Sequence, residues 1–173
     1  MTEPINFTVL AGHSAPTTAN DTPVKSNAVS FTVLGLPIPQ GSMRAYQNRL
    51  ISNNDKALKS WRHDVATAAL QHRPDDWDVK APVELHCKFV FPRPMGDFGT
   101  GRNAGTVKAS APKHHTKRPD TDKLTRSIGD AISVKTKVLL HDDSQIVSIN
   151  STKRYADINE PAHAQITVIP LAA

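Results

Sequence analysis

A chain of 173 residues, 38% of them hydrophobic, is long enough to bury one sizeable core and too short for two. No segment reaches the roughly 18 apolar residues of a membrane span, and no signal peptide opens the chain, which predicts a cytoplasmic protein without membrane contact. The single cysteine excludes a disulfide framework and a thiolate-rich zinc site. A net charge of +5 favours an anionic partner such as nucleic acid.

The N-terminal part of the chain divides into a polar segment and a first strand. Residues 1–27 are rich in Thr, Ala, Ser, Asn and Pro, which predicts a flexible tail before a folded domain over residues 28–173. From Val29 to Leu34 the β-branched and aromatic residues predict the first core strand. The prolines and glycines of Gly35–Gly41 end that strand.

A basic segment and a helix follow. Arg44 and Arg49 stand in a stretch with little acid, which we interpret either as a phosphate-contacting loop or as an ordinary solvated loop. The polar run Asn53–Asp55 is typical of a helix N-cap, and apolar residues at helical spacing predict a helix to about His72. Trp61 lies on the apolar stripe and is expected in the core.

The clearest strand of the sequence runs from Val83 to Phe91. Apolar and polar residues alternate along it with period two, so one face is buried. Cys87 falls on the buried face, and we assign it no catalytic role because nothing nearby would activate a thiolate.

A long glycine-containing loop follows this strand, with its mobile basic part over residues 98–118. Loops of this length are usually functional or disordered, so it is either a segment that wraps a phosphate backbone or a floppy surface loop. The adjacent His114 and His115 are expected to contact phosphate or solvent rather than one metal ion. The cationic residues of the loop are Arg102, Lys108, Lys113, Lys117 and Arg118.

Two carboxylates, Asp120 and Asp122, come directly after this basic loop. Neighbouring acids repel one another, so they are retained most readily where a cation neutralises them. Ligation by oxygen alone suits Mg²⁺ or Mn²⁺. Helix capping is the competing interpretation, because Asp favours the N-cap and the first helical turn.

The residues that follow form an amphipathic helix pattern. At about 100° per residue, Asp122, Arg126 and Asp130 lie within about 80° of one another on one face. Arg126 could steady the carboxylates or meet a phosphate oxygen, or it could form an ordinary i,i+4 salt bridge. The opposite, apolar face consists of Leu124, Ile128, Ala131 and Ile132.

A second acidic pair, Asp142 and Asp143, follows the apolar run Val138–Leu140. Acids are poor strand formers, so their position before a strand requires a reason. We expect Val147 and Ile149 to point inward on that strand, which continues through Tyr155. The last strand buries Ala164, Ile166 and Val168 and ends at Pro170. The order of elements predicts one α+β domain, with helices on one face of a small mixed sheet.

At these residues the chain resembles the RusA family of Holliday junction resolvases, which are common in bacteriophages and prophages. The features that carry the resemblance are Arg118-Pro119-Asp120-Thr121-Asp122, the helix with Asp130, and the run from Asp142 to Val147. Lys153-Arg154-Tyr155 is also similar to the family. The resemblance covers about residues 29–170 and is specific from about 117 to 155.

The resemblance implies that Asp120, Asp122 and Asp143 ligate a catalytic Mg²⁺, for which Mn²⁺ could substitute, with Asp130 and Asp142 in support. Arg126 stands where the family usually has lysine, and arginine is bulkier and does not give up a proton. Lys123 replaces the usual Asn, and the connection around residues 133–137 is slightly longer. The family also implies a homodimer in a bacterial or phage-infected cell.

We therefore predict a Mg²⁺-dependent endodeoxyribonuclease that resolves four-way DNA junctions in recombination, repair or phage DNA processing. The basic loop, Arg44, Arg49 and Lys153 would hold the DNA. The main alternative is a non-catalytic nucleic-acid-binding module whose acids are structural caps. A glycosyltransferase with an Asp-x-Asp metal site is a third class, but such enzymes need a nucleotide-binding α/β half that is not visible here.

Overall fold

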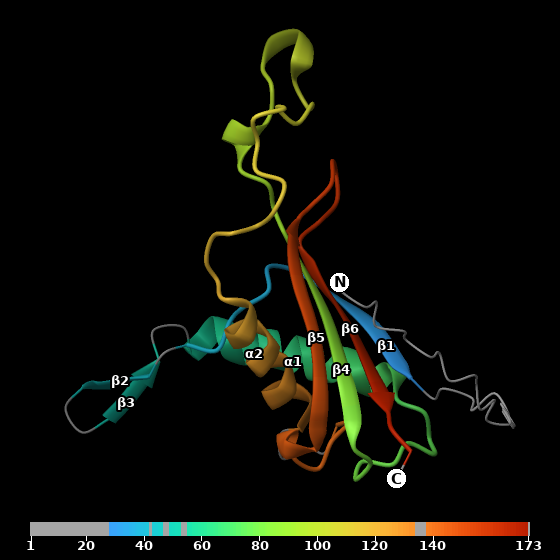
Figure 1. The fold of residues 1–173 in the computed structure, drawn as a ribbon. Coiled ribbons are helices and arrows are strands. Elements are labelled where there is room, and N and C mark those ends of the chain that lie inside the picture. Colours follow the sequence, from blue (N-terminus) through green and yellow to red (C-terminus); the bar gives the residue numbers. More distant parts are fainter. Residues whose placement is uncertain (1–27, 42, 47–48, 53–54, 134–137, 173) are drawn as a thin grey trace, which may run out of the picture.

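The computed structural model describes residues 28–41, 43–46, 49–52, 55–133 and 138–172, and for residues 43–46, 49–52 and 55 it describes the backbone alone. Its body is a mixed sheet in the order β1-β6-β4-β5 (Figure 1). Strand β6 (His163–Pro170) pairs antiparallel with both β1 (Val29–Leu34) and β4 (Val83–Phe91). Strand β5 (Ile146–Tyr155) pairs parallel with β4 at the edge of the sheet. The predicted strands over 29–34 and 83–91 are confirmed at the same bounds.

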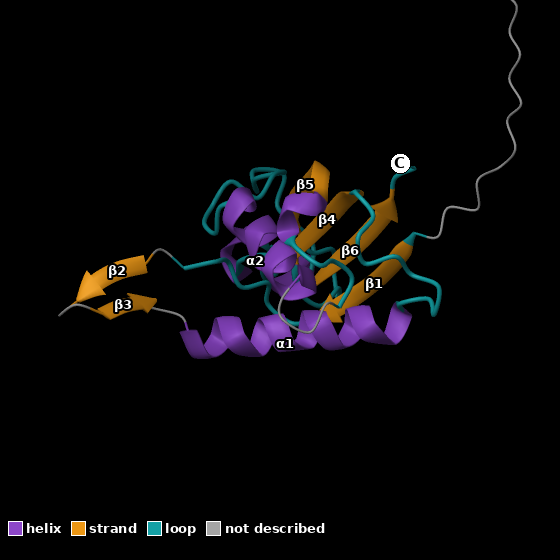
Figure 2. Cartoon of the chain, turned by 90° about the horizontal axis from the view of Figure 1, so that it is seen from below, coloured by secondary structure: helices purple, strands orange, loops and turns teal. Residues whose placement is uncertain are grey.

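Two helices cover one face of this sheet, so the α+β prediction is confirmed. Helix α1 (Asp55–His72) packs along β1, and helix α2 (Thr121–Ser133) packs against α1 and β5 (Figure 2). The apolar face predicted for α2 is fully buried, and Trp61 of α1 lies in the core. Neither helix of the described ranges combines the length and apolar character that a bilayer crossing requires.

The other face of the sheet carries polar side chains. The Ser30 and Thr167 hydroxyls lie 2.9 Å apart across β1 and β6, and Glu84 pairs with His86 at 2.8 Å. Hydroxyl and charged groups at these positions remain hydrated, which is typical of a sheet with one solvated face. The hydrophobic core therefore lies on the helix-covered face of the sheet.

The prediction that Val147 points inward is wrong, since it is 62% exposed. Ile149 pairs with the buried Leu85 and faces the same side, but it is 57% exposed. The register of β4 and β5 shifts, so that Val83 pairs with Ile146 while the next β4 residue pairs with Ser148. This bulge leaves Val147 without a partner and changes the phase of the strand. Ile146 rather than Val147 packs against the core, and Ile149 lies at the rim because β5 is an edge strand.

The segment with Arg44 and Arg49, predicted as a loop, is a hairpin. Strands β2 (Met43–Tyr46) and β3 (Arg49–Ser52) pair antiparallel and project away from the main sheet (Figure 1). Strands of only four residues are too short to leave a clear period-two signal in a sequence. The side chains of Arg44 and Arg49 lie outside the described part of the structure. The predicted tail, residues 1–27, also lies outside it.

The long connection from β4 to α2 forms an extension above the sheet that contains two short 3-10 turns, η1 (Met95–Asp97) and η2 (Gly101–Asn103). Arg93 fixes its base, because the guanidinium lies 4.6 Å from the Tyr155 ring centroid and donates to the Pro112 carbonyl at 2.9 Å. The mobility predicted for residues 98–118 stays a prediction.

The core position of Cys87 has a measurable consequence. The side chain is 1% exposed, and burial raises the pKa of its thiol to about 12, so almost no thiolate forms at neutral pH. We expect a thiol reagent to leave the folded protein unlabelled and to label it fully in guanidinium. Because Cys87 is the one cysteine of the sequence, rapid labelling of the folded protein would contradict this placement.

Candidate metal and DNA site

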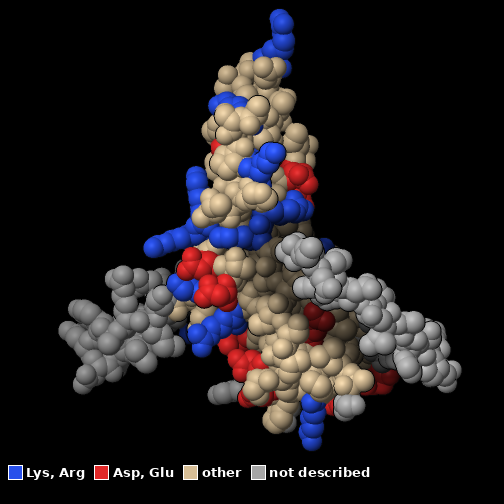
Figure 3. Space-filling view, in the orientation of Figure 1, with Lys and Arg blue, Asp and Glu red and all other residues tan. Residues whose placement is uncertain are grey.

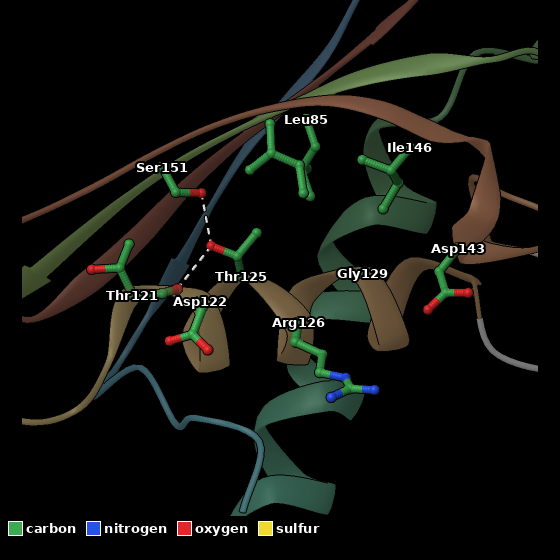
Figure 4. A pocket seen from close by; sticks show the side chains of 10 residues that line it. Leu85, Thr121, Asp122, Thr125, Arg126, Gly129, Asp143, Ile146 and Ser151 are labelled. Carbon is green, nitrogen blue, oxygen red and sulfur yellow. Dashed lines mark hydrogen bonds between the residues drawn. The ribbon is translucent and has the colours of Figure 1, made fainter.

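A pocket of about 370 Å³ lies between α2, the 3-10 helix η3 (Asp143–Gln145) and β5. Asp122 and Arg126 of α2 and Asp143 of η3 line this pocket, which is here called the acid pocket. Figure 4 shows Asp122 and Asp143 at opposite ends, with Arg126 between them. The apolar floor consists of Leu85, Ile146 and Ile149. Two predicted acids and the predicted basic residue therefore share one pocket.

The packing of α2 on β5 holds the acid pocket together. The Thr125 hydroxyl lies 2.9 Å from the Thr121 carbonyl oxygen and 2.7 Å from the Ser151 hydroxyl, so it joins helix and strand. One turn later the helix presents Gly129, where an added Cβ would come within 3.3 Å of the Ile146 side chain. The absence of a side chain at Gly129 allows this close approach.

Asp142 is a structural cap and faces no pocket described here. Its carboxylate accepts the Ser144 backbone N–H at 2.9 Å, and the Gln145 side chain accepts the Asp142 N–H at 2.9 Å, which completes a capping box. Hydrogen bonds from Ser144 are the main cause of the lowered pKa of Asp142. The Gln145 amide also donates to the Val79 and Ala81 carbonyls, so this cap fixes the backbone from which Asp143 projects.

Asp120 faces a different cavity from Asp122. It lines a pocket of about 770 Å³ between the turn after β1 and the segment leading into α2, here called the turn pocket. Its carboxylate lies 2.9 Å from the Lys123 ammonium, and the hydrogen bond from Lys123 is the main cause of its lowered pKa. Its backbone carbonyl accepts the Leu124 N–H at 3.1 Å, so Asp120 begins the helix through its main chain.

Asp130 pairs with Arg62 of α1 and lines none of the pockets described here. The same guanidinium donates to the side-chain oxygen of Gln40, in the turn after β1. Gln40 N–H in turn donates to the Lys123 carbonyl at 2.9 Å. Asp130 therefore helps to hold α2 against α1 and the turn.

The side chains fit a divalent metal only in part. Carboxylate oxygens suit Mg²⁺ or Mn²⁺, and both Asp122 and Asp143 turn to the acid pocket. Among the described residues, however, no three His, Cys, Asp or Glu side chains are close enough to form a metal site. Asp120, the third predicted ligand, lines the turn pocket instead of the acid pocket.

The predicted cationic residues of the extension are exposed. In Figure 3, Lys and Arg side chains spread over the extension, and acids gather directly below them (Figure 3). Lys108 donates to the Gly96 carbonyl at 2.9 Å within the extension. The other exposed members of the set are Arg102, Lys113, Lys117 and Arg118.

Lys153 is engaged differently from these exposed cations. Its ammonium donates to the Lys117 and Pro119 carbonyls, at 2.8 Å each. It therefore fixes the segment that leads into Asp120. The exposed cations of the extension, by contrast, remain accessible to an anionic partner.

The expectation that His115 contacts phosphate or solvent is wrong. The residue is 8% exposed, and its ring packs between those of Phe91 and Tyr155, at centroid distances of 4.6 and 4.7 Å. Burial is the main cause of its lowered pKa. His114 remains exposed.

Four residues that position the acids were not predicted from the sequence: Gln40, Arg62, Thr125 and Gln145. Gln145 carries a readable signal, because it follows Asp142 by three residues in the spacing of a capping box. The partners of Arg62 and Gln40 are remote in sequence, and a single sequence contains no signal for such contacts.

The different environments of the adjacent acids predict different effects on stability. Asp142→Ala removes the cap and should lower the melting temperature by about 3 °C, whereas Asp143→Ala should leave it within about 1 °C because the side chain is exposed. Since the pKa of Asp142 is lowered in the folded state, the stabilisation is present above its ordinary value of 3.8 and lost as the pH falls below it.

Thermal unfolding of the two variants at pH 7 and at lower pH values measures this difference. The gap between wild type and Asp142→Ala should shrink on acidification. Equal loss of stability in both variants would contradict the assignment of the cap to Asp142.

Comparison with known proteins identifies a family. The family profile described as Endodeoxyribonuclease RusA matches residues 35–168. A search among curated proteins found no match. The matched range includes the acid pocket, the turn pocket and the extension.

Proposed function

Because the chain belongs to the RusA family of endodeoxyribonucleases, whose members resolve Holliday junctions, we propose that it cuts four-way DNA junctions at the acid pocket in a Mg²⁺-dependent reaction. The observation that carries this proposal is the placement of Asp122, Arg126 and Asp143 around one pocket. Resolvases of this family generally depend on a divalent metal. The choice of Mg²⁺, with Mn²⁺ as a substitute, rests on the oxygen-only donor set.

Asp122 and Asp143 would hold the ion, and Asp120 would join them after leaving Lys123. When bound, the ion supplies Lewis-acid stabilisation of the phosphate and an activated water. Asp120 and Lys123 form an exposed pair, and such pairs are weak, so their exchange costs little. In this proposal Asp130 and Asp142 support the site through the backbone, as the pair with Arg62 and the cap of η3 indicate.

Arg126 would stabilise charge on the phosphate. A guanidinium stays protonated at any pH that the protein survives, so it cannot act as a general base. It does provide several fixed N–H donors for phosphate oxygens. Its place between the two carboxylates of the acid pocket fits electrostatic stabilisation of the transition state.

The exposed cations of the extension would hold the DNA arms by neutralising phosphates. Arg44 and Arg49 of the hairpin are further proposed contacts, from their position in the chain alone. Cutting two strands symmetrically requires two acid pockets, so we propose a homodimer that acts in the cytoplasm of a bacterial or phage-infected cell.

The alternative is a DNA-binding module without catalysis. It is favoured by the cap at Asp142 and by the pairing of Asp120 with Lys123, since both acids already have structural partners. Neither partner accounts for Asp122 and Asp143. The two proposals differ in what these two acids do, and that difference can be measured.

Asp122→Asn should abolish cleavage of a synthetic four-way junction while junction binding persists. Loss of one group that stabilises transition-state charge typically costs a factor of 10² to 10³, so we expect a reduction of at least about a hundredfold. Binding should be unchanged or tighter, because a negative charge that faces DNA is removed. Gel cleavage assays with and without Mg²⁺, and anisotropy without metal, measure the two effects.

Asp64→Asn is the matched control, since Asp64 is an exposed acid of α1 that lines none of the pockets described here. It should cut the junction at the wild-type rate, and linear duplex should be a poor substrate for both proteins. Persistent cleavage by purified Asp122→Asn would reject the site assignment.

Lys153 and Lys113 should differ in the salt dependence of DNA binding. Loss of one phosphate contact lowers the slope of log K against log salt by about one, which we expect for Lys113→Met. We expect Lys153→Met to leave the slope unchanged and to reduce cleavage, because its ammonium binds carbonyls beside Asp120. A reduced slope for Lys153→Met would instead make it a direct phosphate contact.

A further inference from the structure

The turn pocket is a second concave site beside the acid pocket. Its volume of about 770 Å³ falls in the range of small-molecule sites. Asp120 lies in its wall, and Asp122, two residues further along, lies in the wall of the acid pocket. The first turn of α2 thus separates the two cavities.

Both walls of the turn pocket are fixed. On one side the Gln40 N–H donates to the Lys123 carbonyl at 2.9 Å, and the Gln40 side chain is held by Arg62. On the other side the Lys153 ammonium donates to the carbonyls of Lys117 and Pro119. A cavity that is already formed avoids part of the entropic cost of binding.

The floor of the pocket is also rigid. His115 lines the pocket with its ring packed between Phe91 and Tyr155. Phe91 is 4% exposed and belongs to the core cluster. Through Phe91 the floor is therefore continuous with the sheet.

The lining has two chemical halves. The turn after β1 contributes an apolar wall of Leu36, Pro37, Ile38 and Pro39. The opposite wall contributes the cations Arg118 and Lys123, and Asp120 is the one acid of the described lining. A flat apolar group attached to an anion matches both halves, which describes a nucleotide with its base against the apolar wall and its phosphate near the cations.

We infer that the turn pocket takes one nucleotide of the DNA strand, next to the phosphate that is cut. This inference rests on the proposed function and deepens it. A DNA strand that crosses the first turn of α2 places one phosphate over the acid pocket and the neighbouring nucleotide in the turn pocket. The pocket then contributes to binding at one position of the strand, and base preference at the cut is decided there.

The test uses the full chain and four-way junctions that each lack one base at a successive position around the exchange point. Binding is measured by fluorescence anisotropy without divalent metal, so that no strand is cut. Loss of a stacked base costs roughly tenfold in affinity, and we expect this loss at one position next to the cut. The remaining abasic positions should bind within about twofold of the intact junction.

Leu36→Asp is the pocket variant, and Leu34→Asp is its matched control. The side chains are 52% and 70% exposed, so neither change disturbs the core. Leu36 lines the turn pocket, whereas Leu34 lies outside its lining. Leu36→Asp should weaken binding to the intact junction roughly tenfold and remove the extra effect of the sensitive abasic position. Leu34→Asp should behave as wild type.

A flat abasic scan, or equal effects of the two leucine variants, would overturn the inference. These outcomes are separate from failure of the proposed function. If the protein cuts junctions but the scan is flat, the nuclease proposal stands and the nucleotide pocket is wrong. If the scan shows one sensitive position that Leu36→Asp removes, but no metal supports cleavage, the nucleotide pocket stands and the nuclease proposal fails.

Discussion

The packing of α2 against β5 is the constraint on which the site depends. Asp122 belongs to the helix, whereas Asp143 belongs to the turn that leads into the strand, so the separation between helix and strand fixes the separation between the acids. Gly129 permits the close approach, and the Thr125 hydroxyl joins the helix to Ser151. Since protein interiors are close-packed, a larger side chain at Gly129 requires either the Ile146 side chain or the helix to shift.

The environment of each acid distinguishes structural from chemical roles. Asp120, Asp130 and Asp142 are each matched by a cation or a backbone donor. Across the described ranges, no salt bridge reaches Asp122 or Asp143. Carboxylates with fixed partners can support a fold without any ligand, whereas Asp122 and Asp143 line the acid pocket with Arg126 between them. This contrast is stronger support for a metal at the acid pocket than the number of acids in the sequence.

The sequence predicts best what depends on periodicity. Helical spacing correctly placed Leu124 and Ile128 in the core and Arg126 on the exposed face, because helix geometry is regular. It failed at Val147, where one extra residue in the strand inverts the alternation, and a bulge has no periodic signal. The side-chain contacts of Asp130 were also beyond reach, since its partner Arg62 belongs to the other helix. Elements can thus be read locally, but the site is assembled from contacts between distant segments.

The parallel pairing of β4 and β5 determines when the acid pocket can exist during folding. The strands are neighbours in the sheet, yet residues 92–145, with the extension and α2, lie between them in the chain. Closing so long a connection carries an entropic cost before the pairing stabilises it. Asp143 leads directly into β5, so it comes to the acid pocket beside Asp122 only when this non-local pairing has formed. A nascent or partly unfolded chain therefore carries the acidic residues without an assembled site.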